Sequence, residues 1–411
     1  MKILTADYIL TCNDKFEIIK NGAVCFDEKI IEIGKKEEVI KNNPYARVKK
    51  LSPNSVIMPG LVNTHVHLEF SANKTTLAYG NFIKWLKSVI EKRDILKKSC
   101  DNECYELAIE TMLQSGTLAF GAVSSFGDDM EVCFEAPQRV VYFNEILGSN
   151  PDKIEEIKFE FERRVQKSFK YERDSFIPAL SVHAPYSTHP VLAKYVVDLA
   201  KRDNLTVSTH FMESMSEREW LDSARGDFEE FLSFFSKNAK PMYGNALEYL
   251  EIFKECKTTF IHANCCNDTE YEKISNMKGS ISHCLVSNRV LNNPVLNLKK
   301  VISHNIPLCI GTDGLSSNIS LNMWDELRSA LFAHMNFDVL RLAKYLMQAV
   351  TKNGAYALGL EDIGYLKEGK KADIITVVLP GHVEDAEQLP LELILHTKEV
   401  KSGYINGERY V

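Results

Sequence analysis

The segment IMPGLVNTHVH, residues 57–67, determines the architecture, because it reads as an apolar, buried strand that ends in His65 and His67. Comparable apolar runs recur along the chain, with helical stretches between them. They are residues 57–67, 116–125, 139–147, 177–185, 205–210, 258–265, 279–285 and 306–314. Eight buried strands that alternate with helices predict an α/β fold, a (β/α)8 TIM barrel over residues 57–371.

Helices are predicted in the gaps between these strands. In NFIKWLKSVI, residues 81–90, the apolar residues have the spacing i, i+3, i+4, i+7 and i+8 of one buried helix face, behind a candidate cap at Asn81. Ser216 and Glu219 fit a capping box that opens the helix after the fifth strand. Both signals support the alternation of strands and helices.

The two ends of the chain have a different pattern of apolar and polar residues from the middle. Residues 1–56 alternate short apolar stretches with polar turns, which is typical of antiparallel β-structure. Residues 372–411 repeat this pattern and contain a hairpin signal at Asn406-Gly407. We therefore expect residues 1–56 and 372–411 to form one small β-sandwich domain, and residues 57–371 to form the barrel domain.

The composition is that of an ordinary globular protein, with 45% hydrophobic and 26% charged residues in a chain of 411. A net charge of −7 argues against a general nucleic-acid or anionic-membrane surface. No apolar run approaches the roughly 18 residues of a membrane helix, and the start lacks a signal-peptide pattern, so we expect a cytoplasmic protein. The ten scattered cysteines are expected to be reduced thiols. Whether the chain forms a homodimer stays open.

Polar residues stand where the predicted strands end, which is where TIM barrels carry their chemistry. The first strand ends in His65 and His67, and later strands end in His183, His210, His262 and Asp313. A single histidine at such a position is more often a satisfied polar residue or a helix cap. The set as a whole is harder to explain in that way.

His65 and His67 are two residues apart on one strand and therefore point to the same side. With a third histidine and an aspartate from two other strand ends, they offer three neutral nitrogen ligands and one carboxylate to a divalent ion. No lysine ends a predicted strand, so a modified lysine that bridges two metals is not expected. We predict one metal ion.

Glu213 follows His210 by three residues and lies just beyond the same strand end. In isolation it reads as an exposed loop carboxylate. Beside a metal site, a protonated carboxyl can carry protons to a ring nitrogen or a leaving group.

Five motifs together resemble the mononuclear-metal branch of the amidohydrolase superfamily, which contains nucleobase and nucleoside deaminases and chlorohydrolases. They are PGLVNTHVHLEF, THFMES, FIHANC, GTDGLSSN and GYLKEGKKADIITV, and the resemblance covers nearly the whole chain. It implies that His65, His67, His210 and Asp313 bind one divalent metal ion, zinc first and iron second. It also implies that Glu213 carries a proton to the ring, that His262 supports Asp313 in activating water, and that His183 touches the substrate.

Within this branch, the chain looks most like enzymes that deaminate the adenine ring of a 5′-modified adenosine and release ammonia. The expected partner is therefore a small-molecule nucleoside. Guanine or cytosine deamination and chlorohydrolysis are the alternatives, since the metal cage is common to all of them. A catalytically silent binding protein is a further alternative.

Three residues are candidates for contacts with the rest of the substrate. Relatives that take S-adenosylhomocysteine carry arginines on and after the third strand, where this chain has Glu145 near the strand end. Arg289 is an alternative cation for a substrate carboxylate, although it reads equally well as a surface arginine. Glu91 and Glu69 are candidates for the ribose hydroxyls, and both could equally be structural.

Overall fold

The computed structural model describes residues 1–73, 75–234 and 239–411. Contacts within the chain divide it into two compact units. The first consists of Met1–Asn63, Ile109–Phe120 and Asn322–Val411, and the second of Thr64–Ala108 and Gly121–Leu321. The candidate site described below lies within the second unit.

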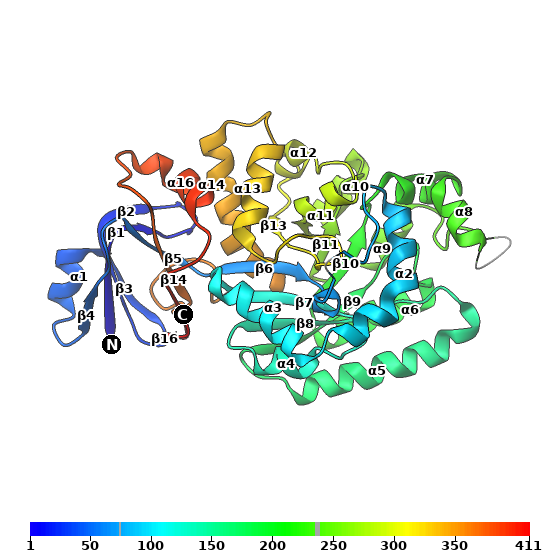
Figure 1. The fold of residues 1–411 in the computed structure, drawn as a ribbon, viewed down its shortest axis with the longest axis horizontal. Helices are drawn as coiled ribbons and strands as arrows, with labels where there is room; N and C mark the ends of the chain where they lie inside the picture. Colours follow the sequence, from blue (N-terminus) through cyan, green and yellow to red (C-terminus); the bar gives the residue numbers. More distant parts are fainter. Residues whose placement is uncertain (74, 235–238) are drawn as a thin grey trace. The chain divides into compact units, whose positions relative to one another are not determined.

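Eight strands form one sheet in the order β13-β12-β11-β10-β9-β8-β7-β6 (Figure 1). They are β6 (Leu61–Val66), β7 (Thr117–Ser124), β8 (Arg139–Ile146), β9 (Phe176–Val182), β10 (Val207–Phe211), β11 (Thr258–His262), β12 (Ser280–His283) and β13 (Leu308–Ile310). The pairs from β8 to β13 are parallel. Every residue of β7 and β8 is buried, as expected for strands covered on both faces.

The first and last strands of this sheet also meet, which closes the barrel. The hydroxyl of Thr64 donates to the carbonyl of Ile310 at 2.9 Å. Just beyond β13, the amide of Asp313 donates to the carbonyl of His65 at 3.0 Å. The eight predicted strands and the TIM barrel are confirmed.

Helices follow the barrel strands in the predicted alternation (Figure 1). They are α2 (Phe82–Ser99), α3 (Asn102–Gln114), α4 (Met130–Glu135), α5 (Ile154–Lys170), α6 (Pro190–Asp203), α7 (Met215–Ser223), α8 (Asp227–Ser233), α9 (Ala246–Ile252), α10 (Asp268–Asn276), α11 (Leu285–Val290), α12 (Leu298–Ser303), α13 (Met323–Ala333), α14 (Val339–Gln348) and α15 (Gly354–Leu358). Asn81 caps α2 as predicted, by accepting from the amide of Lys84. The predicted capping box at Ser216 is wrong, because Ser214 caps α7.

The terminal strands build a second, mixed sheet in the order β16-β15-β14-β5-β1-β2-β3, with β4 also paired to β1, and it contains both chain termini (Figure 1). Its strands are β1 (Lys2–Leu10), β2 (Ile18–Phe26), β3 (Ile30–Lys35), β4 (Arg47–Lys50), β5 (Ser55–Pro59), β14 (Ile374–Val378), β15 (Ser402–Ile405) and β16 (Glu408–Arg409). Two helices accompany them, α1 (Lys36–Asn42) and α16 (Leu389–His396). The predicted hairpin at Asn406-Gly407 is confirmed, because both residues have positive φ between β15 and β16.

The expectation of purely antiparallel pairing at the chain ends is wrong. β1 pairs antiparallel with β2, but it pairs parallel with β4 and with β5. The alternation of apolar and polar residues is the same in both kinds of pair, so the pattern could not distinguish them.

The domain boundaries remain a proposal. β5 ends in the mixed sheet at Pro59, β6 begins in the barrel at Leu61, and β14 returns the chain to the mixed sheet at Ile374. We propose a β domain of residues 1–56 and 372–411 and a barrel domain of residues 57–371. The compact units are drawn differently, because they group α13, α14 and α15 with the terminal strands.

Cys100 and Cys104 form a disulfide between the C-cap of α2 and the first turn of α3. For this pair the expectation of reduced thiols is wrong, whereas the other eight cysteines are free in the described chain. A C-x3-C spacing across a helix junction brings two thiols close enough to bond, which the spacing alone did not indicate. Among the described residues, no helix combines the length and apolarity that crossing a membrane requires.

Candidate active site

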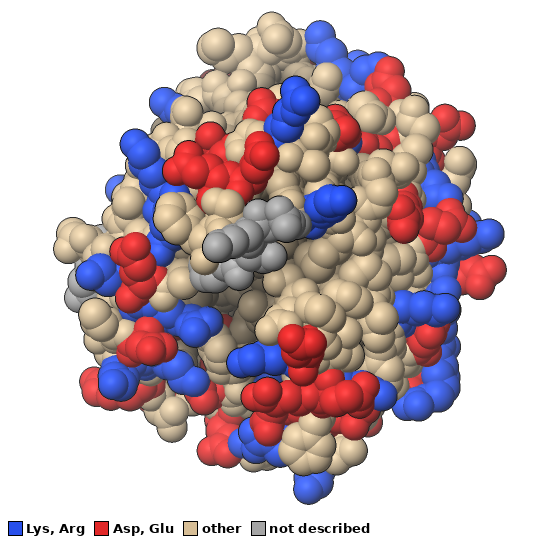
Figure 2. Space-filling model, turned by 90° about the vertical axis from the view of Figure 1, so that its right-hand side faces the viewer, with Lys and Arg blue, Asp and Glu red and all other residues tan. Residues whose placement is uncertain are grey.

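A cavity of about 890 Å³ opens at the carboxyl ends of the barrel strands. We call the part lined by strand-end residues the inner end; these are His67, Glu145, His183, His210, Glu213, His262 and Asp313. We call the rest the outer end; it is lined by α2, by the segment after β8, and by residues on and after α7 and α8. Lys, Arg, Asp and Glu side chains are interspersed on the face of the molecule drawn in Figure 2.

The four predicted metal ligands converge at the inner end, although His65 lies in β6, His67 directly follows β6, His210 lies in β10 and Asp313 follows β13. Nε2 of His67 lies 3.4 Å from Nε2 of His210. Oδ1 of Asp313 lies 3.5 Å from Nε2 of His65 and 3.9 Å from Nε2 of His67. Atoms that share one ion about 2.0–2.2 Å away have separations of this size.

The surroundings of His67, His210 and Asp313 favour the protonation states that metal binding requires. Burial and the neighbouring His65 lower the pKa of His67 to about 4, and they hold the pKa of His210 well below its ordinary value. Burial disfavours the charge of Asp313, but the hydrogen bond and charge of His65 hold its pKa well below the usual range. His67 and His210 are therefore favoured as neutral imidazoles beside an ionised Asp313, and nitrogen donors with one carboxylate are a donor set that fits a single divalent ion.

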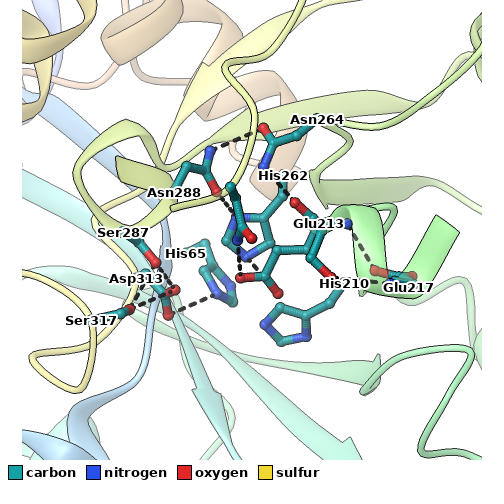
Figure 3. Close-up of polar contacts among 12 residues, drawn as sticks. His65, His210, Glu213, Glu217, His262, Asn264, Ser287, Asn288, Asp313 and Ser317 are labelled. Atoms are coloured by element: carbon teal, nitrogen blue, oxygen red, sulfur yellow. Dashed lines mark hydrogen bonds and ion pairs between the residues drawn. The ribbon is translucent and has the colours of Figure 1, made fainter. Parts of the chain in front are cut away.

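Neighbouring groups orient two of these ligands. Nδ1 of His210 donates to the carbonyl of His183 at 2.9 Å, so that Nε2 keeps its lone pair for a metal. Oδ2 of Asp313 accepts from the hydroxyls of Ser287 at 2.8 Å and Ser317 at 3.1 Å. Figure 3 shows these two serines behind Asp313, with His65 on its other side.

Glu213 lies opposite His262, with its Oε2 3.6 Å from Nε2 of that histidine (Figure 3). Burial, reinforced by the negative charges of Asp313 and Glu217, raises the pKa of Glu213 well above its ordinary value. The raised pKa favours the protonated form of Glu213, which can donate a proton. Asn293 contacts its other oxygen at 3.3 Å.

A chain of amides holds His262 and Glu213 in place (Figure 3). Nδ1 of His262 donates to Oδ1 of Asn288 at 2.9 Å. Asn288 in turn donates to Asn264, and Asn264 donates to the carbonyl of Glu213. Since burial lowers the pKa of His262 to about 4, its ring is neutral, and its Nε2 is an acceptor that faces Glu213.

Glu217 fixes the turn that carries Glu213. Its buried carboxylate accepts from the amide of Met212 at 3.0 Å and from the amide of Glu213 at 2.8 Å. The pattern of the sequence did not identify this role, because Glu217 appeared only as an interior residue of a presumed capping box. A glutamate three residues after the true cap, Ser214, is the signal that could have found it.

Several residues at the strand ends have left-handed backbone conformations. φ is 51° at Met212, 72° at His262, 52° at Ala263 and 59° at Asp313. Such values are uncommon for residues other than glycine, and they cluster at functional sites. These left-handed residues turn the chain out of the strands at the points where the polar side chains enter the cavity.

The structure places the other residues that were predicted to contact the substrate in different surroundings. His183 lines the cavity, and its Nδ1 lies 2.5 Å from the hydroxyl of Ser187. Glu69 is buried behind the wall, where it accepts from Ser124 and from the amide of Phe126. Glu91 and Arg289 are exposed and lie outside the described lining of the cavity. The structure therefore does not bring Glu69, Glu91 or Arg289 to the cavity.

The outer end is mainly apolar and aromatic. Trp85 of α2 forms one wall and is anchored there, because its indole nitrogen donates to the carbonyl of Ser316 at 2.9 Å. Trp220 and Phe231 stand on α7 and α8. Arg93 and Lys240 are the cations among the described lining residues, and neither was selected from the sequence.

The model of the amidohydrolase family matches residues 56–410. The chain belongs to the amidohydrolase family. This amidohydrolase is 44% identical to the aminodeoxyfutalosine deaminase of Nitratiruptor sp., over the full length of both chains. It is 35% identical to the adenosine deaminase of Helicobacter pylori, again over both full lengths.

Solved structures agree with these sequence relatives. The amidohydrolase resembles the crystal structure of Helicobacter pylori aminofutalosine deaminase in complex with methylthio-coformycin, with a TM-score of 0.95. The two chains are 34% identical, and the match covers 100% of each. The family resemblance that the motifs indicated is therefore confirmed.

Proposed function

We propose that the protein hydrolytically deaminates the adenine ring of a 5′-modified adenosine, specifically 6-amino-6-deoxyfutalosine, to give futalosine and ammonia. The observation that carries the proposal is the cage of His65, His67, His210 and Asp313 with protonated Glu213 beside it. The full-length relatives named for aminodeoxyfutalosine and adenosine deamination support the substrate. We further propose that this step belongs to menaquinone biosynthesis.

His65, His67, His210 and Asp313 would hold the metal ion, which we propose to be zinc, with iron as the alternative. Three nitrogens and one carboxylate oxygen suit either ion. Bound there, the ion supplies Lewis acidity that lowers the pKa of water from 15.7 toward about 7.

The side chains around the cage provide the proton transfers. Protonated Glu213 donates to the ring nitrogen next to the amine-bearing carbon, which makes that carbon more electrophilic. Asp313 and the neutral His262 accept the proton that the attacking water loses. That proton then passes to the amino group, which leaves as ammonia, and the remaining hydroxyl proton on the ring carbon returns to Glu213, so that one water is consumed for each ammonia released.

Incubation of the metal-loaded protein with 6-amino-6-deoxyfutalosine tests the proposal. We expect release of ammonia and a shift of the adenine ultraviolet band toward that of hypoxanthine. Adenosine, 5′-methylthioadenosine and S-adenosylhomocysteine serve as comparison substrates. If none of these adenine nucleosides releases ammonia, the proposal is wrong.

Guanine or cytosine deamination and chlorohydrolysis remain the second candidates, since the cage is common to these reactions. The size of the cavity favours a nucleoside, because about 890 Å³ exceeds what a free base needs. The same substrate screen, extended to guanine, cytosine and a chloro-triazine, discriminates between them.

A further inference from the structure

The strand β12 is the one barrel strand that brings no residue to the described lining of the cavity. Each of the other seven has a lining residue at its end or within three residues after it, whereas residues 280–293 contribute none to the described lining. The chain after β12 nevertheless contacts the site from behind, through Ser287, Asn288 and Asn293. We call residues 287–293 the supporting segment.

Ser287 fixes which oxygen of Asp313 faces the metal cage. Its hydroxyl lies 2.8 Å from Oδ2 of Asp313, and the hydroxyl of Ser317 lies 3.1 Å from the same atom (Figure 3). The low pKa of Asp313 favours the ionised carboxylate, which only accepts hydrogen bonds, so both hydroxyls donate to Oδ2. Oδ1 is left as the atom that faces His65 and His67.

The chain of amides behind His262 can run in one direction only. The carbonyl of Glu213 is an acceptor, so the side-chain nitrogen of Asn264 donates to it at 2.9 Å. Oδ1 of Asn264 then accepts from Nδ2 of Asn288 at 3.0 Å, which leaves Oδ1 of Asn288 as an acceptor. Nδ1 of His262, 2.9 Å from that oxygen, therefore carries the ring proton. The lone pair of the neutral ring is on Nε2, on the side of Glu213 (Figure 3).

Asn293 makes the corresponding contact with Glu213. Its side-chain nitrogen donates to Oε1 of Glu213 at 3.3 Å, so Oε2 is left to carry the acid proton, 3.6 Å from Nε2 of His262. The backbone holds Asn293 close to Asn288, because the amide of Asn293 donates to the carbonyl of Asn288 at 2.8 Å. One short segment therefore contacts the carboxylate, the imidazole and the carboxyl group that the proposed reaction uses.

Packing alone does not account for the polar side chains of this segment. Ser287 and Asn288 are fully buried on consecutive positions of α11, and neither is in the described lining of the cavity. A buried polar side chain costs free energy of desolvation unless it finds partners, and these two find theirs in Asp313 and His262. One turn of helix thus sets the orientation of both groups.

We propose that the supporting segment orients the three groups that transfer protons, and that Asn288 is the positioning residue that keeps His262 in the Nδ1–H tautomer. The inference rests on the proposed function for the roles of Asp313, His262 and Glu213. It gives β12, which brings no residue to the described lining, a part in the site. Because these side chains act behind the reacting groups, losing one should lower kcat and leave KM nearly unchanged.

Asn288→Ala is the main variant, since the side chain of Asn288 bonds His262 and Asn264 rather than a metal ligand. With 6-amino-6-deoxyfutalosine as the substrate, we expect kcat to fall roughly 10- to 100-fold, as for other outer partners of metal sites, while KM stays within about threefold. The zinc content, measured by elemental analysis, should equal that of the wild type.

Asn144→Ala is the matched control. Asn144 is as buried as Asn288, and its side chain donates to Ser168 of α5 and to the carbonyl of Ala179 in β9. The control therefore removes the same buried amide from a place away from the proton-transfer groups. It should lower Tm but keep the wild-type kcat.

A second measurement does not depend on turnover. In metal-loaded protein with ¹⁵N-labelled histidines, long-range ¹H–¹⁵N spectra report the tautomer of His262, whose signals are assigned by their absence in His262→Asn. We expect the Nδ1–H form in the wild type and in Asn288→Asp, which keeps the acceptor. Asn288→Ala should populate the Nε2–H form as well.

The proposal is overturned if wild-type His262 is in the Nε2–H form, a result that needs no variant to fold. It is also overturned if Asn288→Ala keeps the wild-type kcat, or if Asn144→Ala loses as much of it. Absence of ammonia from every adenine nucleoside rejects the proposed function. In that event, loss of the Nδ1–H form in Asn288→Ala alone would still support the positioning of His262.

Discussion

The inner and outer ends of the cavity are built from different kinds of chain. At the inner end, the polar side chains stand at the ends of barrel strands and all but the half-buried His183 are buried, and most of them are held by a named neighbour, as Asp313 is by Ser287. At the outer end, helices and connecting segments supply mostly apolar side chains, and the cations Arg93 and Lys240 are exposed. Under the proposed function, the reacting groups stand at strand ends and the 5′ substituent meets helices and connecting segments, which is the usual division of roles in a TIM barrel.

The largest effect is expected from a variant that disrupts the metal cage at the inner end. His67→Ala deletes one of the four ligands, so the variant should bind metal poorly and its deamination rate should fall to background. Elemental analysis and an ammonia assay measure both quantities. As a control, wild-type protein stripped by a chelator should lose activity and regain it with zinc. Full activity in metal-free His67→Ala would contradict the cage.

The next largest effect is expected from a variant that impairs proton transfer at the inner end but leaves metal binding intact. Glu213→Gln keeps the shape of the side chain but cannot deliver a proton in the same way. We expect kcat/KM to fall roughly 10²- to 10⁴-fold while the metal content stays at the wild-type level. A variant with wild-type turnover would show that another group protonates the ring.

A smaller effect should follow from loosening the turn behind Glu213. In Glu217→Gln, one backbone amide of the turn loses its acceptor, and we expect kcat/KM to fall about tenfold. The negative charge of Glu217 helps to raise the pKa of Glu213, so its removal lowers that pKa. Because Glu213 must be protonated to donate, the alkaline limb of the kcat/KM profile should move to lower pH. An unchanged limb would show that Glu217 is only structural.

The smallest effect belongs to the outer end. Arg93→Gln should raise KM about 3- to 5-fold for a substrate with a carboxylate on its 5′ substituent, since an exposed ion pair contributes little. KM for adenosine, which lacks the carboxylate, should stay within about twofold. Arg289→Ala is the matched control and should change neither KM, because Arg289 lies outside the described lining. If Arg289→Ala instead raises KM for the carboxylated substrate and Arg93→Gln does not, Arg289 is the residue that contacts the 5′ substituent.

The difference between the two ends also explains what could be predicted from the sequence. The period of two along a strand and the closed barrel order place His65, His67, His210 and Asp313 on one side without any knowledge of coordinates. A helix offers no such constraint. Arg93 of α2 lines the cavity while Glu91, two residues earlier, does not, and the rotation of the helix that decides this comes from packing.

Glu145 shows a different limit of prediction. Its position near a strand end was evident from the sequence. It was noted there only because relatives that take S-adenosylhomocysteine carry arginines in this region. The structure shows that its side chain is buried 3.9 Å from Nδ1 of His210 and accepts from the hydroxyl of Ser125, neither of which the sequence pattern contains. Similarly, the parallel pairing of β1 with β5 depends on a neighbour some fifty residues away, and local alternation does not contain that information.

The left-handed residues at the strand ends have a consequence for engineering. Each such conformation outside glycine costs on the order of 1–2 kcal/mol, so the turns at Met212, His262 and Asp313 are sustained by the packed scaffold around them. β-Branched replacements are excluded there, while glycine would relax the backbone and release the orientation of the side chain. A directed-evolution library aimed at heat resistance should therefore diversify the exterior of the barrel and leave these turns unchanged, because gains in robustness there would come at the expense of turnover.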